Sequence, residues 1–168
     1  MIDPEPRTTP QRSERERTGG FIVIGAMVIL MWLVETIDIV AGNLDDAGIH
    51  PRDVDGLPGI AASPFLHAGF GHLIGNTLPF LVLGAAIAVG GLMRTLAVVG
   101  IIAVVGGLGT WLTAPSNTVV IVIYGSTLLT GLVPTPGISW QGHLFGAIGG
   151  LVAARVLHRA RRGAAQPV

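Results

Sequence analysis

The sequence predicts an all-α, polytopic membrane helical bundle, and three observations support this fold class. Half of the 168 residues are hydrophobic, only 12% are charged, and the mean hydropathy is +0.67. The ten acidic and ten basic residues gather in the two tails and one loop, leaving five apolar segments with little charge. Inside a bilayer only helices or closed barrels satisfy their own backbone hydrogen bonds, and a spanning helix needs about 20 residues.

The first apolar segment, residues 21–40, follows a polar arm of residues 1–20 that carries four arginines. This arm is too long for a typical short signal peptide, so we expect the segment to be retained. Glu35 and Asp38 mark its far third, and we expect them to sit at the interface or to face protein, with a solvated interface favoured by the acidic loop that follows. We expect the Arg-rich arm to be mobile and cytoplasmic, residues 21–157 to form the membrane domain, and residues 158–168 to form a basic cytoplasmic tail that is mobile over residues 161–168.

The other segments follow in order along the chain. An acidic loop over residues 42–63 precedes predicted helices over residues 72–91 and 95–113. A fourth apolar run, residues 119–133, is short for a span, because 15 helical residues cover about 22 Å of a core of about 30 Å. A Pro-Thr-Pro-Gly turn then leads to the last predicted helix, residues 140–157, which ends among arginines.

The charge pattern conflicts with five full passes. Arginine-rich flanks prefer the cytoplasm, which places the N-terminal arm and Arg94 inside and the acidic loop outside. Five passes would leave the Arg-rich C-terminus outside. The conflict disappears if one pass is absent between residues 113 and 119, or if the short fourth segment returns to the side from which it came.

Two polar clusters at membrane depth are the candidate functional residues, because ionisable groups there are costly. In the first, His67 precedes the second helix, and His72 and Asn76 lie four residues apart on one helical face. In the second, His143 stands between Gly142 and Gly146 at the start of the last helix. Together with Gly150, these glycines form a stripe at four-residue spacing that permits close helix approach.

These clusters resemble the rhomboid family of intramembrane serine proteases. A His, a second His five residues on and an Asn four beyond is the second-helix pattern of that family, and the Gly-His-x-x-Gly of the last helix is similar too. The likeness runs from Trp32 to Arg155 and is strongest to bacterial, actinobacterial-like members. It implies that His143 is the general base, that His72 and Asn76 line an oxyanion hole, and that His67, Gly142 and Gly146 support the site.

The nucleophile of that family is missing from its expected place. The family carries a Gly-x-Ser-Gly motif about 50 residues before the catalytic His, and this chain has no such motif. Its serines are Ser13, Ser63, Ser116, Ser126 and Ser139. Ser126 alone lies in an apolar segment and is therefore the one candidate nucleophile in this chain. It lies only 17 residues before His143, however, where the family places a packing residue. We hypothesise that about 40 residues are lost between Val120 and Ile121, which leaves a rhomboid-like core of five apolar segments instead of six.

Other interpretations of the same residues stay open. His143 could be a packing residue, Asn76 could bridge helices, and Glu35 with Asp38 could relay protons. The glycine stripe is structural under either interpretation. Metal binding is disfavoured because the histidines lack ligand spacing and the acidic residues lie elsewhere. The absence of cysteine excludes disulfides, thiol nucleophiles and cysteine-ligated metals.

Two functions follow from the resemblance. The first is an intramembrane serine protease that acts on transmembrane segments of membrane proteins and that is inactive in this chain. The second is a non-catalytic, rhomboid-like protein that binds membrane helices. We expect an integral protein of a bacterial plasma membrane, in contact with lipid, without a cofactor and without a nucleic-acid partner. A transporter or channel would need a charged path through the bilayer, and no periodic charged face supports one.

Overall fold

The computed structural model describes residues 9–116 and 140–164 of the chain. Its four long helices are α1 (Thr9–Ala41), α3 (Phe70–Ala88), α4 (Leu92–Thr113) and α5 (Trp140–Ala164). Between α1 and α3 lie short elements: η1 (Leu44–Ala47), η2 (Val54–Gly56), α2 (Gly59–Ala62) and η3 (Ser63–Phe65). The described residues hold no strand, so the predicted all-α fold is confirmed.

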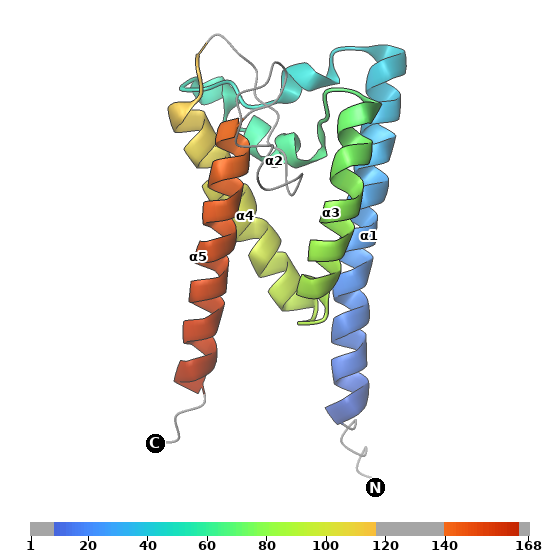
Figure 1. The fold of residues 1–168 in the computed structure, drawn as a ribbon, viewed down its shortest axis with the longest axis vertical. Helices are drawn as coiled ribbons and strands as arrows, with labels where there is room; N and C mark the ends of the chain where they lie inside the picture. The colour runs from blue at the N-terminus through green and yellow to red at the C-terminus, as the bar shows by residue number, and fades with distance from the viewer. Residues whose placement is uncertain (1–8, 117–139, 165–168) are drawn as a thin grey trace, which may run out of the picture.

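The long helices alternate in direction (Figure 1). Helix α1 starts and α5 finishes at one end of the bundle, which we call the basic end because it also holds Arg94 at the start of α4. The opposite, acidic end carries the loop with Asp45, Asp46, Asp53 and Asp55. Since α4 ends and α5 begins at the acidic end, α5 runs back to the basic end, and the conflict that five passes would create does not arise for the described helices.

Three of the described helices are long and apolar enough to cross a membrane: Ser13–Ala41 within α1, and all of α3 and α4. They correspond to the first three predicted spans. The predicted segment 119–133 lies outside the described residues. The predicted helix 140–157 forms most of α5, in which polar side chains and small residues at the start and arginines at the end lower the hydropathy.

Helix α1 begins twelve residues earlier than residue 21, where the sequence predicts it, so the prediction of a mobile arm is wrong for residues 9–20. Pro10 sits in the first turn, where its missing N–H costs little. Charges three apart, such as Glu14 and Arg17, suit a helical surface. The extension also packs: a Cβ on Gly20 would lie 2.8 Å from the Ala88 carbonyl oxygen, so only glycine allows this approach to α3.

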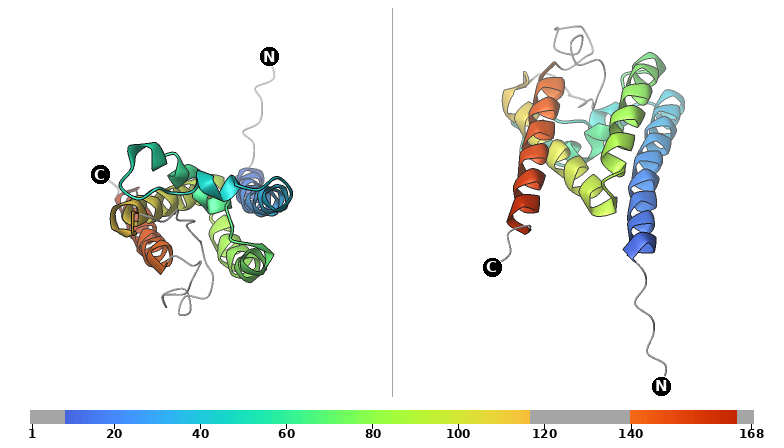
Figure 2. Two further views of the ribbon diagram at one scale, coloured as in Figure 1. Left: turned by 90° about the horizontal axis from the view of Figure 1, so that it is seen from above. Right: turned by 60° about the horizontal axis from the view of Figure 1, so that its bottom comes forward.

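Helix α4 occupies the middle of the bundle, with α5 on one side and α1 and α3 on the other (Figure 2). The most extensive packing between helices is that of α4 with α5, followed by that of α1 with α3. At the acidic end of the second pair, the Trp32 indole N–H donates to the Thr77 hydroxyl at 3.1 Å. The Trp32 ring also lies 5.9 Å from the Phe70 ring, measured between centroids.

The acidic loop is fastened to the end of α4. The Arg52 guanidinium donates to the carbonyls of Leu112 (3.2 Å) and Ala114 (2.6 Å), and the Trp111 indole N–H donates to the Asp53 carbonyl at 2.8 Å. A cation at a helix C-terminus pairs with otherwise unsatisfied carbonyls and with the helix dipole. This Arg52 clamp holds the loop that leads into the polar site.

Asp45 on this loop provides a test of the local electrostatics. Burial, and then the charges of Asp38 and Asp46, raise the pKa of Asp45 above 3.8. The folded state therefore binds this proton more tightly than the unfolded state, so stability falls as pH rises from 3.8 through the raised pKa. We expect Asp45→Asn to raise the melting temperature in detergent at pH 7, with a gain that shrinks on acidification and vanishes below pH 3.8.

The matched control for Asp45 is Asp55→Asn, because Asp55 is an exposed carboxylate on the same loop. This variant should melt like the unmodified chain at both pH values. A lower melting temperature for Asp45→Asn at pH 7 would mean that the carboxylate makes a stabilising contact, and our account of its environment would then be wrong.

Candidate functional site

Two of the predicted site histidines meet at the acidic end of the bundle. The rings of His67 and His72 lie 5.7 Å apart between centroids, with an angle of 69° between their planes. His67 is only 4% exposed, and its Nδ1 lies 3.4 Å from the Phe65 carbonyl oxygen. A carbonyl can only accept, so this contact assigns the ring hydrogen to Nδ1.

The position of His67 before α3 follows from the backbone there. Helix α3 begins after Gly69, whose φ of 98° favours glycine, and this sharp entry brings His67 back over the first turn, beside His72. Burial lowers the pKa of His67 below 6.5, and the Phe65 carbonyl opposes that shift only in part. The ring is therefore neutral at pH 7.

Asn76 and His72 are buried without the hydrogen bonds that such groups normally make. Asn76 is 3% exposed. Among the residues that the structure describes, neither polar atom of its side chain and neither ring nitrogen of His72 has a hydrogen-bond partner. Leaving a buried polar group unpaired costs about 1–3 kcal/mol. Groups left in this state are expected where a ligand or reacting group completes the set.

The structure brings His143 to the same site. His143 lies in the first turn of α5 at the acidic end, is 8% exposed and interacts electrostatically with His72. His67, His72, Asn76 and His143 therefore lie at the same end of the bundle. With five full passes, His72 and His143 would stand at opposite membrane faces, and the described helices do not have that arrangement.

The described residues show how the glycines of α5 lie relative to α4. The close contact with α4 falls on Gly149, where a Cβ would lie 3.0 Å from the Ile102 Cα. At Gly146 and Gly150 a Cβ would meet nothing within 4 Å. Gly142 is buried in the first turn, next to His143. Among the described residues, Gly149 and not Gly146 or Gly150 makes the close approach to α4, and sequence spacing alone could not separate these neighbouring helical faces.

Three further sequence predictions concern Ser126, Glu35 and metal binding. Ser126 lies outside the described residues. Glu35 is buried at 1% exposure, so of the two expectations it faces protein and does not lie at a solvated interface; Asp45 of the loop interacts with it electrostatically. Within residues 9–116 and 140–164, no group of three His, Asp or Glu residues could hold a metal ion.

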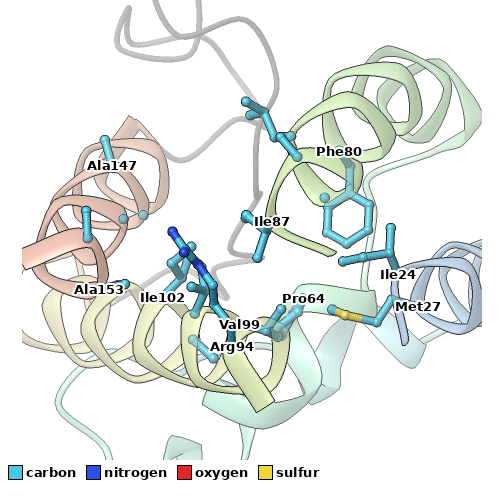
Figure 3. Close-up of a pocket in the computed structure, with 18 of the residues that line it drawn as sticks. Ile24, Met27, Pro64, Phe80, Ile87, Arg94, Val99, Ile102, Ala147 and Ala153 are labelled. Atoms are coloured by element: carbon cyan, nitrogen blue, oxygen red, sulfur yellow. The ribbon is translucent and has the colours of Figure 1, made fainter. Parts of the chain in front are cut away.

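A cavity of about 500 Å³ lies below the polar site, between α1, α3, α4 and α5. Figure 3 shows Ile24 and Met27 of α1, Phe80 and Ile87 of α3, and Ala147 and Ala153 of α5 around it. Its lining is mostly apolar. His143 borders it, and Arg94 contributes a charged group. We call this space the interhelical groove.

Sequence reasoning missed the residues that position the site. Arg52 is a lone arginine in an acidic loop, and its contacts with α4 are 60 or more residues away in sequence. Ile49 is fully buried, beside Ala114, Ile60 and Trp111. Arg52 has one sequence signal, a cation among carboxylates. Ile49 has none, because the loop holds several other aliphatic residues that are not fully buried.

The fold and the site define a helical membrane protein with a buried histidine and asparagine cluster at one end. Comparison with known proteins then identifies the family: a model described as the Rhomboid domain matches residues 57–125 and 114–160. The chain belongs to the rhomboid family and is an integral membrane protein. No solved structure matches it significantly.

The relatives come from mycobacteria. An uncharacterized protein of Mycobacterium tuberculosis is 37% identical over 205 aligned positions, covering 95% of this chain and 85% of the relative. An uncharacterized protein of Mycobacterium leprae is 34% identical over 200 positions, covering 94% of this chain and 79% of the relative. These matches agree with the actinobacterial-like resemblance of the sequence.

The alignment with the M. tuberculosis protein also measures an internal difference in length. Because 95% of 168 residues is about 160, an alignment of 205 positions contains about 45 that no residue of this chain occupies. The family model likewise matches in two stretches that overlap at residues 114–125. The overlap includes the junction between Val120 and Ile121, where the sequence predicts a loss of about 40 residues.

Proposed function

We propose that the polar cluster is the site of an intramembrane serine protease, and that this chain is inactive because the segment with the nucleophile is absent. The substrates of such a site are transmembrane segments of membrane proteins, cleaved by peptide-bond hydrolysis. One observation carries the proposal: His143 lies at the same end of the bundle as His72 and as an Asn76 amide that is buried without a hydrogen-bond partner among the described residues.

Each residue has a role that its chemistry supports. A neutral His143 imidazole can take the proton of a serine hydroxyl and return it to the leaving amine. The Asn76 amide N–H, together with a His72 ring N–H, can donate to the oxyanion that develops on the attacked carbonyl. His67 packs against His72 and supports its orientation. The unpaired state of Asn76 and His72 supports these roles, because both groups are free to bind the reacting oxygen.

The described serines do not supply a nucleophile. Ser63 is fully buried and donates to the Ile60 carbonyl at 3.4 Å, while Ser13 and Ser116 are exposed. Ser13 lies on the part of α1 near the basic end, away from His143. Removing the nucleophile from a catalytic set of this kind leaves only the residual contribution of the oxyanion hole and of substrate binding.

We also propose an orientation in a bacterial plasma membrane. Arg15, Arg17, Arg94 and Arg159 all belong to the basic end, and arginine-rich flanks stay in the cytoplasm. Both the N-terminal arm and the basic tail then lie inside, and the polar site lies near the outer surface. This orientation makes residues 21–157 the membrane domain.

The proposal is tested by treating the purified chain with a fluorophosphonate probe, which reacts with activated serines. We expect no labelling. Labelling that disappears in Ser126→Ala and persists in Ser63→Ala would show that Ser126 is an active nucleophile, and the proposed inactivity would be wrong.

A further inference from the structure

Glu35 of α1 is buried near the acidic end of the bundle (Figure 1). Its side chain is 1% exposed, and neither carboxylate oxygen has a hydrogen-bond partner among the described residues. The Gly69 backbone N–H, at the entry to α3, acts on its charge, although the two groups do not meet with hydrogen-bond geometry. An ionised carboxylate in this place has lost its hydration and has gained little in return.

Two other carboxylates act on Glu35 from nearby. Asp38, one turn further along α1, accepts a hydrogen bond from the Leu44 backbone N–H at 2.6 Å, and such a bond favours the ionised form. Asp45 lies on the loop that covers Glu35 and is half-buried. The charges of Asp45 and Asp38 both reach Glu35, the most deeply buried of the three. A further negative charge on Glu35 is therefore opposed by both neighbours.

In the described part of the chain, no positive group faces Glu35 from the elements packed around it. Arg52 is the one arginine of the loop, and its guanidinium is bound to carbonyls at the end of α4. His50 donates from Nε2 to a loop carbonyl at 2.9 Å, and His67 and His72 face each other. Residues 117–139 contain no Lys, Arg or His. The charge of an ionised Glu35 would therefore stay uncompensated.

We propose that Glu35 binds a proton, and that the neutral carboxylic acid fastens the acidic loop and the entry of α3 to α1. A metal ion suits the site less well, because no group of three His, Asp or Glu residues within residues 9–116 and 140–164 could hold one. Loss of the proton would leave charges on Glu35, Asp38 and Asp45 close to one another, without a cation among them. The loop would then move away from α1 and admit water to Glu35.

The proton also stabilises the geometry of the polar site. Gly69, whose N–H acts on Glu35, turns the chain into α3 with a φ of 98°, and His67 lies two residues earlier. A movement at Gly69 therefore displaces the His67 ring from the His72 ring, which lies 5.7 Å away between centroids. This inference does not depend on the protease proposal, because it requires neither a nucleophile nor a substrate.

Infrared spectroscopy of the full chain in lipid vesicles tests the proposal, because a protonated carboxylic acid has a C=O stretching band that an ionised carboxylate lacks. We expect this band at pH 7, where ordinary carboxyl groups are ionised, and its loss in Glu35→Gln. Raising the pH should remove the band, with a lower midpoint in Asp45→Asn, which takes away one opposing charge. Asp55→Asn is the matched control, because Asp55 is an exposed carboxylate on the same loop, and its midpoint should stay unchanged.

Thiol labelling measures the movement of the loop. The chain has no cysteine, so Leu44→Cys reports on a half-buried position of η1 and Ala47→Cys on an exposed position of the same turn. The ratio of the two labelling rates cancels the pH dependence of the thiol itself. Below the pH at which the band disappears, this ratio should rise about tenfold per pH unit, because opening releases one proton. In Glu35→Gln, whose amide is neutral at every pH, the ratio should stay constant.

A band that survives in Glu35→Gln and is lost in Asp45→Asn would place the proton on Asp45 and overturn the proposal. Absence of the band at pH 7 would overturn it too. In that case, a melting temperature that Ca²⁺ or Na⁺ raises in the unmodified chain, but not in Glu35→Gln, would identify a metal cation as the occupant.

Melting curves establish that the variants fold. If Glu35→Gln does not fold, Asp45→Asn still decides, since an unchanged midpoint would show that the proton does not lie beside Asp45. None of these results bears on fluorophosphonate labelling, so the proton-site and the protease proposals fail independently.

Discussion

An extended chain should react with a fluorophosphonate probe, and His143→Ala should then remove that reactivity. The extended chain carries, inserted after Val120, the residues of the M. tuberculosis relative that align with the gap. The alignment leaves about 45 such positions, since 205 are aligned and about 160 are occupied by this chain. Helix α4 ends and α5 begins at the acidic end. An inserted segment that starts and finishes at that end therefore leaves the direction of α5 unchanged. His143 therefore keeps its place beside His72.

The size of each effect follows from the proposed roles. Loss of a general base lowers the rate by about 10²–10⁴-fold, so His143→Ala should fall in that range. Loss of one oxyanion donor costs about 10²–10³-fold, which is the expectation for Asn76→Ala. The initial rate of labelling of the extended chain measures both.

His158→Ala serves as the control for the extended chain. His158 is on the same helix as His143 but is exposed and lies near the basic end, so its removal should leave labelling unchanged. If the extended chain folds and its labelling survives His143→Ala, then His143 is not the base. The cluster would in that case have a packing role.

Gly59→Ala should lower stability by about 1–3 kcal/mol, the cost of forcing a methyl group into a packed site. A Cβ on Gly59 would collide with the Gly48 carbonyl group and lie 2.8 Å from the Ile49 backbone nitrogen. Backbone atoms cannot turn aside as a flexible side chain can. The loop must therefore move, and with it Ile49, which is fully buried against the end of α4.

The melting temperature in detergent, measured for Gly59→Ala and for Gly100→Ala, checks this expectation. Gly100 lies within α4 with nothing near its Cβ position, and alanine favours a helix over glycine, so this control should melt at the same temperature or slightly higher. Equal melting of both variants would show that the Gly48–Gly59 contact does not constrain the loop.

The sequence predicts the helices well because hydropathy over about 20 residues is a strong signal. Residues 72–91 and 95–113 correspond closely to α3 and α4. The prediction fails at the start of α1, where polar residues 9–20 look like a tail. These residues are helical because an apolar helix follows them directly and because Gly20 packs closely against Ala88 of α3. The composition of residues 9–20 contains no information on either contact.

The site is predictable only in part. The spacing of His67, His72 and Asn76 and the resemblance around His143 predict the side chains of the proposed site, and the alternating helices place them at one end. The unpaired state of Asn76, the open side of Gly146 and the Arg52 clamp depend on contacts between distant segments. Such contacts leave no periodic trace in a single sequence.

The Arg52 clamp has a consequence for the order of assembly during synthesis. Its partners, Leu112 and Ala114, precede the region in which this chain and its relatives differ in length. Once residue 116 has emerged from the ribosome, α1, α3 and α4 can pack and the loop can lock, because N-terminal units fold first. The half of the cluster with His67, His72 and Asn76 is then already formed, and α5 docks onto a finished template.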